Sequence, residues 1–193
     1  MPDPNSLPSP EERTLYFTQQ VNQASIADLT KKIISINTSD RRLKKLAKQM
    51  GMKYKPKPIK IFIDSYGGAV YQCFGLLSIM KASETEIHTI VTGCAMSCGF
   101  MMLICGHKRF AYPLSTPLYH QVSTGFMGKL KDMEESVEET KRLQKSIEDI
   151  TFDRTNITRK RLKEVFKGKF DWFMSSDEAL KLGVVDEIID EIP

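Results

Sequence analysis

The sequence predicts a single domain of the α/β class. Segments patterned as strands alternate with segments of helical periodicity along most of the chain, which is typical of this class. Two apolar strand patterns are each followed by a glycine-containing turn and then by a helix pattern. The length of 193 residues suits one domain, and 41% hydrophobic residues are enough for a core without disulfides.

The chain divides into an expected leader and one domain. Residues 1–12 are polar and proline-rich, so we expect a flexible leader there and the domain over residues 13–193. Residues 41–60 contain nine lysines and arginines and no acid, while the rest of the chain has a net charge of −5. Within the basic segment 41–58, the first half has a helical pattern and two prolines make the second half a linker.

The elements are expected in order from apolar patterns and their boundaries. Adjacent apolar residues predict a strand within residues 13–21, and Ser25 with Asp28 forms a capping-box pattern that starts the first helix. Apolar runs predict buried strands at residues 59–64 and 87–92. The turns that follow them begin at Gly67 and Gly93, and helices are expected at residues 70–80 and 100–105.

The second half of the chain continues the alternation. Short strands are expected at residues 109–112, 118–119 and 184–189. Helices are expected at residues 129–150 and 162–166, and a third is capped by Ser175 with Glu178 and ended by Gly183. The long helix has near-heptad positions at Leu130, Met133, Val137, Thr140, Gln144 and Ile147.

Composition and charge exclude several classes of protein. No apolar run reaches the roughly 20 residues of a membrane span, and the polar start lacks a signal-peptide core. The four cysteines form no CxxC pair, so we expect reduced thiols and no metal site. Nucleotide-binding glycine motifs are absent, and the basic segment has no interleaved aromatic beyond Tyr54, which favours a solvated surface over nucleic-acid binding. We expect a cytoplasmic protein without a cofactor.

Two turns have the residues of an acyl-transfer site. Residues 93–99 contain Ala-x-Ser-x-Gly around Ser97, a variant of the nucleophile elbow that lifts a serine hydroxyl above a sheet. The pair Gly67-Gly68 can expose backbone amides with no side chain in the way. The alternatives are that Ser97 only caps a helix, and that the glycines form only a tight turn or cradle a phosphate.

A nucleophilic serine needs a base and a group that orients the base. His120 ends a short strand, where its side chain can face a cleft, whereas His88 lies within an apolar strand and His107 in a polar turn. Asp171 stands beside two aromatic residues, an apolar setting for a carboxylate. Each residue also has a structural interpretation, since a strand-end histidine and a surface aspartate are common.

Together these motifs resemble the proteolytic subunits of the Clp protease family, over residues 13–190. The matching segments are residues 64–68, 93–99, 108–110, 120–121, 171–175 and 178–186. The resemblance implies a crotonase-like α/β fold, with a β-sheet and helix spiral core, and a serine endopeptidase. It also implies Ser97 as nucleophile, His120 as general base, Asp171 as its orienting residue, and the backbone amides of Gly68 and Cys98 as the oxyanion hole.

The resemblance further implies an assembly. The region 122–150 corresponds to a protruding handle helix that joins two stacked heptameric rings, whose chamber admits peptides and unfolded proteins. An AAA+ unfoldase is the family's usual partner, but the shortened N-terminal stretch and the insertion at 41–58 argue against it. The chain also departs from the family pattern with Tyr66 in place of proline and Cys98 in place of methionine.

Two alternatives come from other functional classes. A catalytically silent ring subunit or scaffold would not need Ser97, His120 and Asp171 intact. A crotonase-type acyl-CoA enzyme would explain the two amide-bearing turns but not these three residues together.

Overall fold

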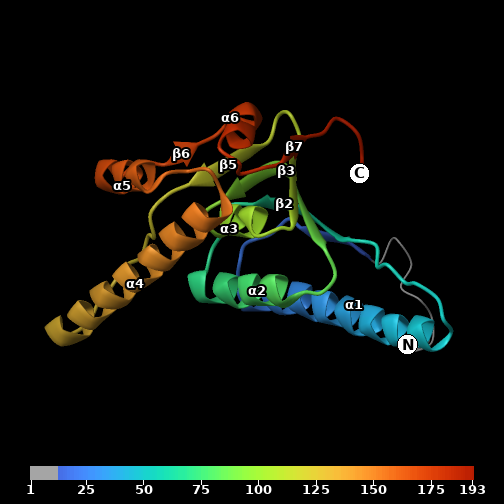
Figure 1. Ribbon diagram of the computed structural model, residues 1–193. Helices are drawn as coiled ribbons and strands as arrows, with labels where there is room; N and C mark the ends of the chain where they lie inside the picture. Colours follow the sequence, from blue (N-terminus) through green and yellow to red (C-terminus); the bar gives the residue numbers. More distant parts are fainter. Residues whose placement is uncertain (1–12) are drawn as a thin grey trace.

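The structure is a computed structural model that describes residues 13–193 (Figure 1). The expected leader at residues 1–12 lies outside the described residues. The strands are β1 (Thr14–Phe17), β2 (Ile59–Ser65), β3 (Ile87–Met96), β4 (Lys108–Ala111), β5 (Thr116–Tyr119), β6 (Trp172–Phe173) and β7 (Glu187–Ile188). The helices are α1 (Gln23–Gln49), α2 (Val70–Ala82), α3 (Cys98–Ile104), α4 (Leu130–Arg154), α5 (Arg159–Gly168) and α6 (Ser176–Lys181).

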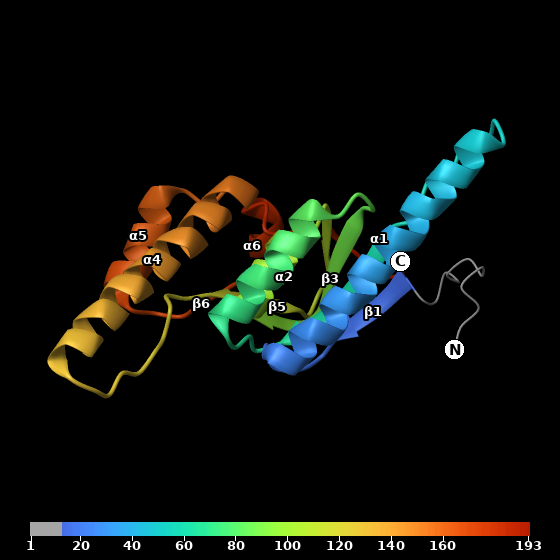
Figure 2. The ribbon, with the colours of Figure 1, turned by 90° about the horizontal axis from the view of Figure 1, so that it is seen from below.

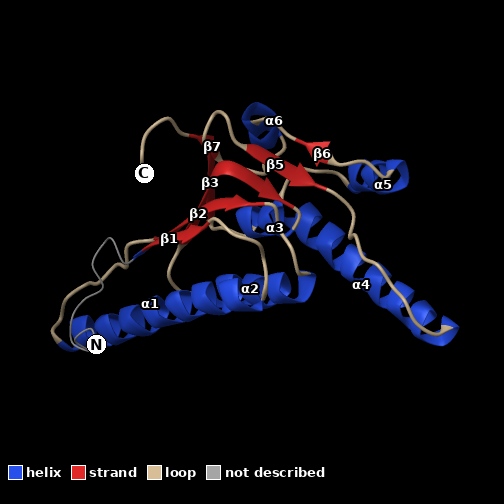
Figure 3. Ribbon diagram, turned by 180° about the vertical axis from the view of Figure 1, so that it is seen from behind, coloured by secondary structure: helices blue, strands red, loops and turns tan. Residues whose placement is uncertain are grey.

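The strands form one mostly parallel sheet in the order β1-β2-β3-β4-β7, and β5 pairs with both β3 and β6. Among the strands of residues 13–193, only the short β5–β6 pair is antiparallel. Helices α1 and α2 lie side by side on one face of the sheet, and α6 lies on the other (Figure 3). Covering both faces keeps a parallel sheet out of water. The predicted α/β class is confirmed.

Helix α1 starts earlier than predicted. Its N-cap is Asn22, whose side chain accepts a hydrogen bond from the backbone N–H of Ser25, while Ser25 Oγ accepts one from the N–H of Asn22. This is a capping box with Ser25 at its third helical position, so the prediction of Ser25 as the cap was wrong. Serine replaces the usual Glu or Gln at that position.

The first half of the basic segment is the end of α1, not a separate helix. No glycine or proline interrupts the run up to Gln49, so the helix continues past the edge of the sheet (Figure 2). Residues 52–58 then lead back to β2 without regular structure, as expected for the predicted linker.

A buried ion pair anchors this extension to the sheet. Both Arg13 guanidinium NH groups bond the carboxylate of Asp40, at 2.5 and 3.0 Å, and Asp40 also accepts hydrogen bonds from Tyr54 (2.7 Å) and Thr85 (2.6 Å). Burial would raise the pKa of Asp40, but the hydrogen bonds from Arg13, Thr85 and Tyr54 outweigh it and lower the pKa. The carbonyl of Lys57 completes the cluster by accepting from Arg13.

Strand β3 is longer than predicted. It continues through Gly93, the expected start of a turn, to Met96 because residues 94–96 pair with β5. The turn therefore lies at Ser97, and α3 begins directly after it at Cys98. The last strand is shorter than expected, since only residues 187–188 pair with β4.

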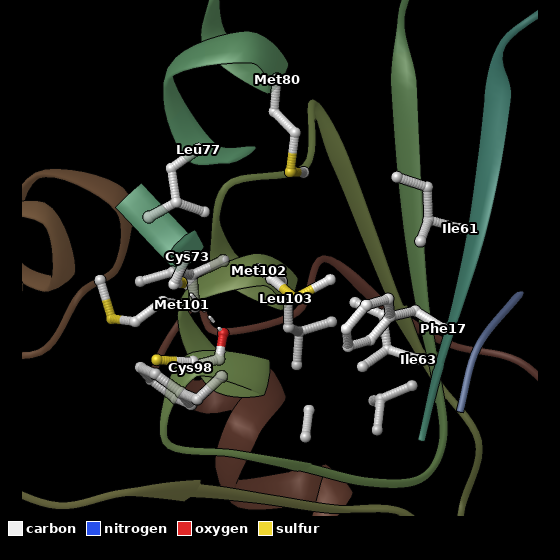
Figure 4. Packing of buried hydrophobic residues seen from close by; sticks show 14 of the residues in the cluster. Phe17, Ile61, Ile63, Cys73, Leu77, Met80, Cys98, Met101, Met102 and Leu103 are labelled. Atoms are coloured by element: carbon white, nitrogen blue, oxygen red, sulfur yellow. Dashed lines mark hydrogen bonds between the residues drawn. The ribbon is translucent and has the colours of Figure 1, made fainter. Parts of the chain in front are cut away.

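The main core lies between the sheet and helices α2 and α3. Figure 4 shows Leu77 and Met80 of α2, Met102 of α3, and Ile61 and Ile63 of β2 converging from these elements. All of these side chains are buried. The short helix α3 is buried along its whole length, which holds the turn before it against the sheet.

Helix α4 has two different halves. Its C-terminal half packs on the domain through Leu143, Ile147 and Thr151, whereas its N-terminal half runs away from the sheet (Figures 1 and 2). Met133 and Val137 on this projecting half are exposed. The near-heptad face therefore does not act as one surface, because Ile147 and Gln144 are already buried within the subunit.

The C-terminal region follows its local signals. Ser175 caps α6 by accepting from the N–H of Glu178, and Gly183 adopts the left-handed φ of 64° just after the helix, as predicted. Arg109 of β4 bonds the carboxylate of Asp186, which ties the end of the chain to the sheet. Within residues 13–193, no helix has the length and apolar character needed to cross a bilayer.

Candidate active site

Ser97 occupies a strained turn between β3 and α3. Its φ of 54° and ψ of −118° lie in a region that non-glycine residues rarely adopt. Apart from Ser97, Lys169 is the one non-glycine residue with positive φ among residues 13–193. Such strain persists only where the surroundings enforce it and is often found at functional sites.

The two glycine-containing turns pack directly against each other. A Cβ atom at Gly67 would lie 2.6 Å from the carbonyl oxygen of Met96 and 2.8 Å from the amide nitrogen of Cys98. A Cβ at Gly99 would lie 2.8 Å from the carbonyl oxygen of Ser65. Glycine at these positions is therefore required by close backbone approach.

Gly68 is held between the turn and the N-terminal region of the domain. Val21 N–H donates to the carbonyl of Gly67 (2.8 Å), and Ala69 N–H donates to the carbonyl of Val21 (2.9 Å). These two bonds flank Gly68 in a parallel bridge, so its own amide is directed away from Val21. Its carbonyl accepts a hydrogen bond from the thiol of Cys98 at 3.2 Å, which links the two turns.

Strand β5 brings His120 to the turn that contains Ser97. Met96 pairs with Leu118, and the N–H of Ser97 donates to the carbonyl of Leu118 at 3.1 Å. His120 follows two residues later, directly after the end of β5. Ser97 and His120 line the same cavity, which has a volume of about 230 Å³.

The other side of β5 brings in Asp171. The antiparallel register pairs Tyr119 with Trp172, so one further step places His120 opposite Asp171. His120 Nδ1 lies 3.5 Å from Asp171 Oδ1. The Asp171 side chain is 57% exposed. The apolar setting suggested by its aromatic neighbours is therefore absent, because Trp172 turns inward and Asp171 outward.

The two other histidines lie away from this cavity. His88 on β3 lies 3.4 Å from Glu86 and packs against Phe110, and burial lowers its pKa. His107 Nδ1 accepts a hydrogen bond from the backbone N–H of Ile87 at 3.0 Å. Neither residue lines the cavity of Ser97.

The cysteines are free thiols, and Cys73, Cys94 and Cys98 are buried. Cys73 donates to the carbonyl of Cys98 at 3.6 Å beneath the elbow (Figure 4). The Cys98 thiol raises the pKa of Cys73, with burial adding to the effect, whereas the Cys73 thiol lowers the pKa of Cys98. Burial raises the pKa of Cys105 to about 11. In residues 13–193, no three His, Cys, Asp or Glu side chains group so that they could hold a metal ion.

Two tyrosines of the cavity were not singled out as site residues by sequence reasoning. Tyr66 is 79% exposed at the cavity and Tyr119 is buried in its wall. The sequence feature that could have indicated them is their position, since Tyr66 directly precedes Gly67 and Tyr119 directly precedes His120. The rest of the wall includes the apolar residues Val70, Met101, Val122 and Ile147 and the polar residues Gln121 and Ser123.

Known proteins that are similar in sequence to this chain come from one family. The chain is 35% identical over 135 residues to the ATP-dependent Clp protease proteolytic subunit of Deinococcus radiodurans, covering 69% of this chain and 65% of the relative. It is 33% identical over 138 residues to the protein of that name from Porphyromonas gingivalis, covering 70% of this chain and 61% of the relative. The chain thus spans less than two thirds of the length of these relatives. A sequence model of the family described as Clp protease matches residues 10–192, and the chain belongs to that family.

Proposed function

We propose that the chain is a serine endopeptidase that cleaves peptides and unfolded proteins through Ser97, His120 and Asp171. The observation that carries the proposal is the register of β5. This strand pairs with β3 on one side and with β6 on the other, so three residues from distant parts of the sequence come together. Membership of the Clp protease family supports a peptidase.

The three residues have the roles of a catalytic triad. His120 takes the proton of the Ser97 hydroxyl as the oxygen attacks a peptide carbonyl. Asp171, 3.5 Å from Nδ1, orients the imidazole and stabilises the cation that forms. His120 then protonates the leaving amine, and water hydrolyses the acyl-enzyme by the same proton transfers in reverse.

The backbone amides of Gly68 and Cys98 supply the oxyanion hole. The two turns contact each other, and the Gly68 amide is directed away from Val21, toward the side occupied by Cys98. Donors fixed in place by packing need no reorganisation as charge develops on the substrate oxygen. Removal of one such donor typically costs about 10²–10³ in turnover.

The proposed assembly is two stacked heptameric rings joined through α4. The exposed apolar side chains Leu130, Met133 and Val137 on its projecting half supply the contact. A closed chamber of this kind would admit peptides and unfolded chains. We place the protein in the cytoplasm and propose residues 41–58 as an insertion. The partner that the family resemblance implies is an AAA+ unfoldase.

A fluorophosphonate probe tests the function. It forms a covalent bond with an activated serine, so we expect labelling at Ser97, found by mass spectrometry, and cleavage of a fluorogenic peptide. Ser97→Ala should lose both, with a fall of about 10⁶ in turnover. Ser146→Ala, at a half-buried position of α4 outside the Ser97 cavity, should keep both. Absence of labelling at Ser97 would count against the peptidase and favour a scaffold or an acyl-CoA enzyme instead.

A further inference from the structure

We propose that the ring of Tyr66 binds an aromatic side chain of the substrate, on a residue next to the scissile bond. The inference rests on the proposed function and adds the class of side chain that the site prefers. Tyr66 lines the same cavity as Ser97 and His120, and it is 79% exposed. A single exposed aromatic residue needs no explanation on its own. This one, however, lies beside the proposed nucleophile, where a peptide must bind to be cleaved.

The backbone on both sides of Tyr66 is fixed. The buried hydroxyl of Ser65 accepts a hydrogen bond from the N–H of Gly67 at 3.1 Å and donates one to the carbonyl of Gln19 at 2.6 Å. A Cβ atom at Gly67 would lie 2.8 Å from the Cβ of Ser97, so the residue after Tyr66 packs directly against the proposed nucleophile. The Tyr66 backbone is therefore held in a defined position relative to Ser97.

The side chain of Tyr66, in contrast, has no partner within the described part of the subunit. Among residues 13–193, none forms a hydrogen bond with its hydroxyl and none stacks an aromatic ring on it. Because the backbone is already fixed and a tyrosine side chain has only two torsions to order, a ligand that packs on this ring loses little of its binding free energy to entropy. The ring is therefore suited to contact a ligand.

The cavity favours an aromatic ligand over a charged or an aliphatic one. None of the described residues that line it is a lysine, arginine, aspartate or glutamate, so an ionised substrate side chain would lose hydration without gaining a countercharge from the wall. Val70 and Met101 add apolar surface to the same cavity. Two aromatic rings that stack or meet edge to face gain affinity beyond the burial of apolar area, whereas an aliphatic side chain of similar size gains only the burial.

A double-mutant cycle between protein and peptide tests the pairing of the rings. Peptides with phenylalanine or leucine, directly before or directly after the scissile bond, are titrated calorimetrically into full-length Ser97→Ala protein. At one of these positions at least, we expect the phenylalanine peptide to bind about three- to tenfold more tightly. Adding Tyr66→Leu should remove this preference, and adding Tyr66→Phe should keep it because the ring remains. Tyr16→Leu is the control and should keep the preference, since that exposed ring stacks on Phe62 outside the cavity.

Equal affinities at both positions, no measurable binding of any peptide, or a preference that survives Tyr66→Leu would overturn the inference. Light scattering tests whether another copy of the chain covers the ring instead: Tyr66→Leu should leave the particle size unchanged, and a smaller particle would also overturn the inference. Cleavage of the same peptides by the protein with Ser97 intact is read separately. Cleavage without a binding preference would refute the role of Tyr66 alone. A preference that depends on Tyr66, without any cleavage, would support that role and count against the peptidase.

Discussion

Replacing Asp171 with asparagine should reduce kcat/KM for a fluorogenic peptide by about tenfold to 10³-fold. The carboxylate lies 3.5 Å from His120 Nδ1. At that distance, Coulomb's law gives about 1 kcal/mol of stabilisation of the imidazolium in water and about 5 kcal/mol at an effective dielectric constant of 20. The Asp171 side chain is 57% exposed, so its stabilisation of the imidazolium should be smaller than the value at a dielectric constant of 20. The loss is thus expected to be smaller than the roughly 10⁴-fold loss typical of a buried triad aspartate.

The assay compares the variant with the parent at low and high ionic strength. Because the His120–Asp171 pair is partly exposed, added salt should screen its interaction and reduce the difference in kcat/KM between the variant and the parent. Asp177→Asn, which removes an exposed carboxylate on α6 away from the cavity, is the control and should keep full activity. If Asp171→Asn retained parental kcat/KM at low salt, Asp171 would have no part in the reaction and the β5–β6 argument would fail.

Two further predictions concern assembly and stability. The double variant Met133→Glu and Val137→Glu should give a smaller particle by light scattering and weaker peptidase activity at unchanged helical content, because charge would enter the proposed ring contact. Lys131→Glu on the same helix is the control. A parent protein that is already monomeric and active would contradict the proposed chamber. Asp40→Asn should cost about 3–5 kcal/mol of unfolding free energy, since it leaves Arg13 buried and unpaired. The folded-state pKa of Asp40 is lowered, so its contribution is present above about pH 4 and is lost as pH falls through the folded value. Urea unfolding across pH 2–7 should therefore show that the unfolding free energies of the parent and Asp40→Asn become more similar as the pH falls. A difference that stays constant with pH would contradict this account.

Local signals were sufficient where neighbours along the chain decide the conformation. The Ser175 cap and the Gly183 end of α6 were predicted because a side chain bonds an amide three residues away and a left-handed φ favours glycine. The turn at Ser97 was also predicted from residues that are neighbours along the chain. Residues 93–99 have small neighbours and a serine, although the pattern placed the turn four residues too early, at Gly93.

The sequence alone determined the α/β class, the order of elements and the candidate residues, because apolar periodicity and turn chemistry are local properties. Only the tertiary structure decided which candidates meet. The register of β5 with its two partners brings His120, and not His88 or His107, to the cavity of Ser97 and places Asp171 beside His120. The same packing buries Ile147, although the near-heptad pattern groups it with Met133 and Val137, which are exposed. Contacts between distant segments depend on how whole surfaces pack, and no short stretch of sequence encodes that.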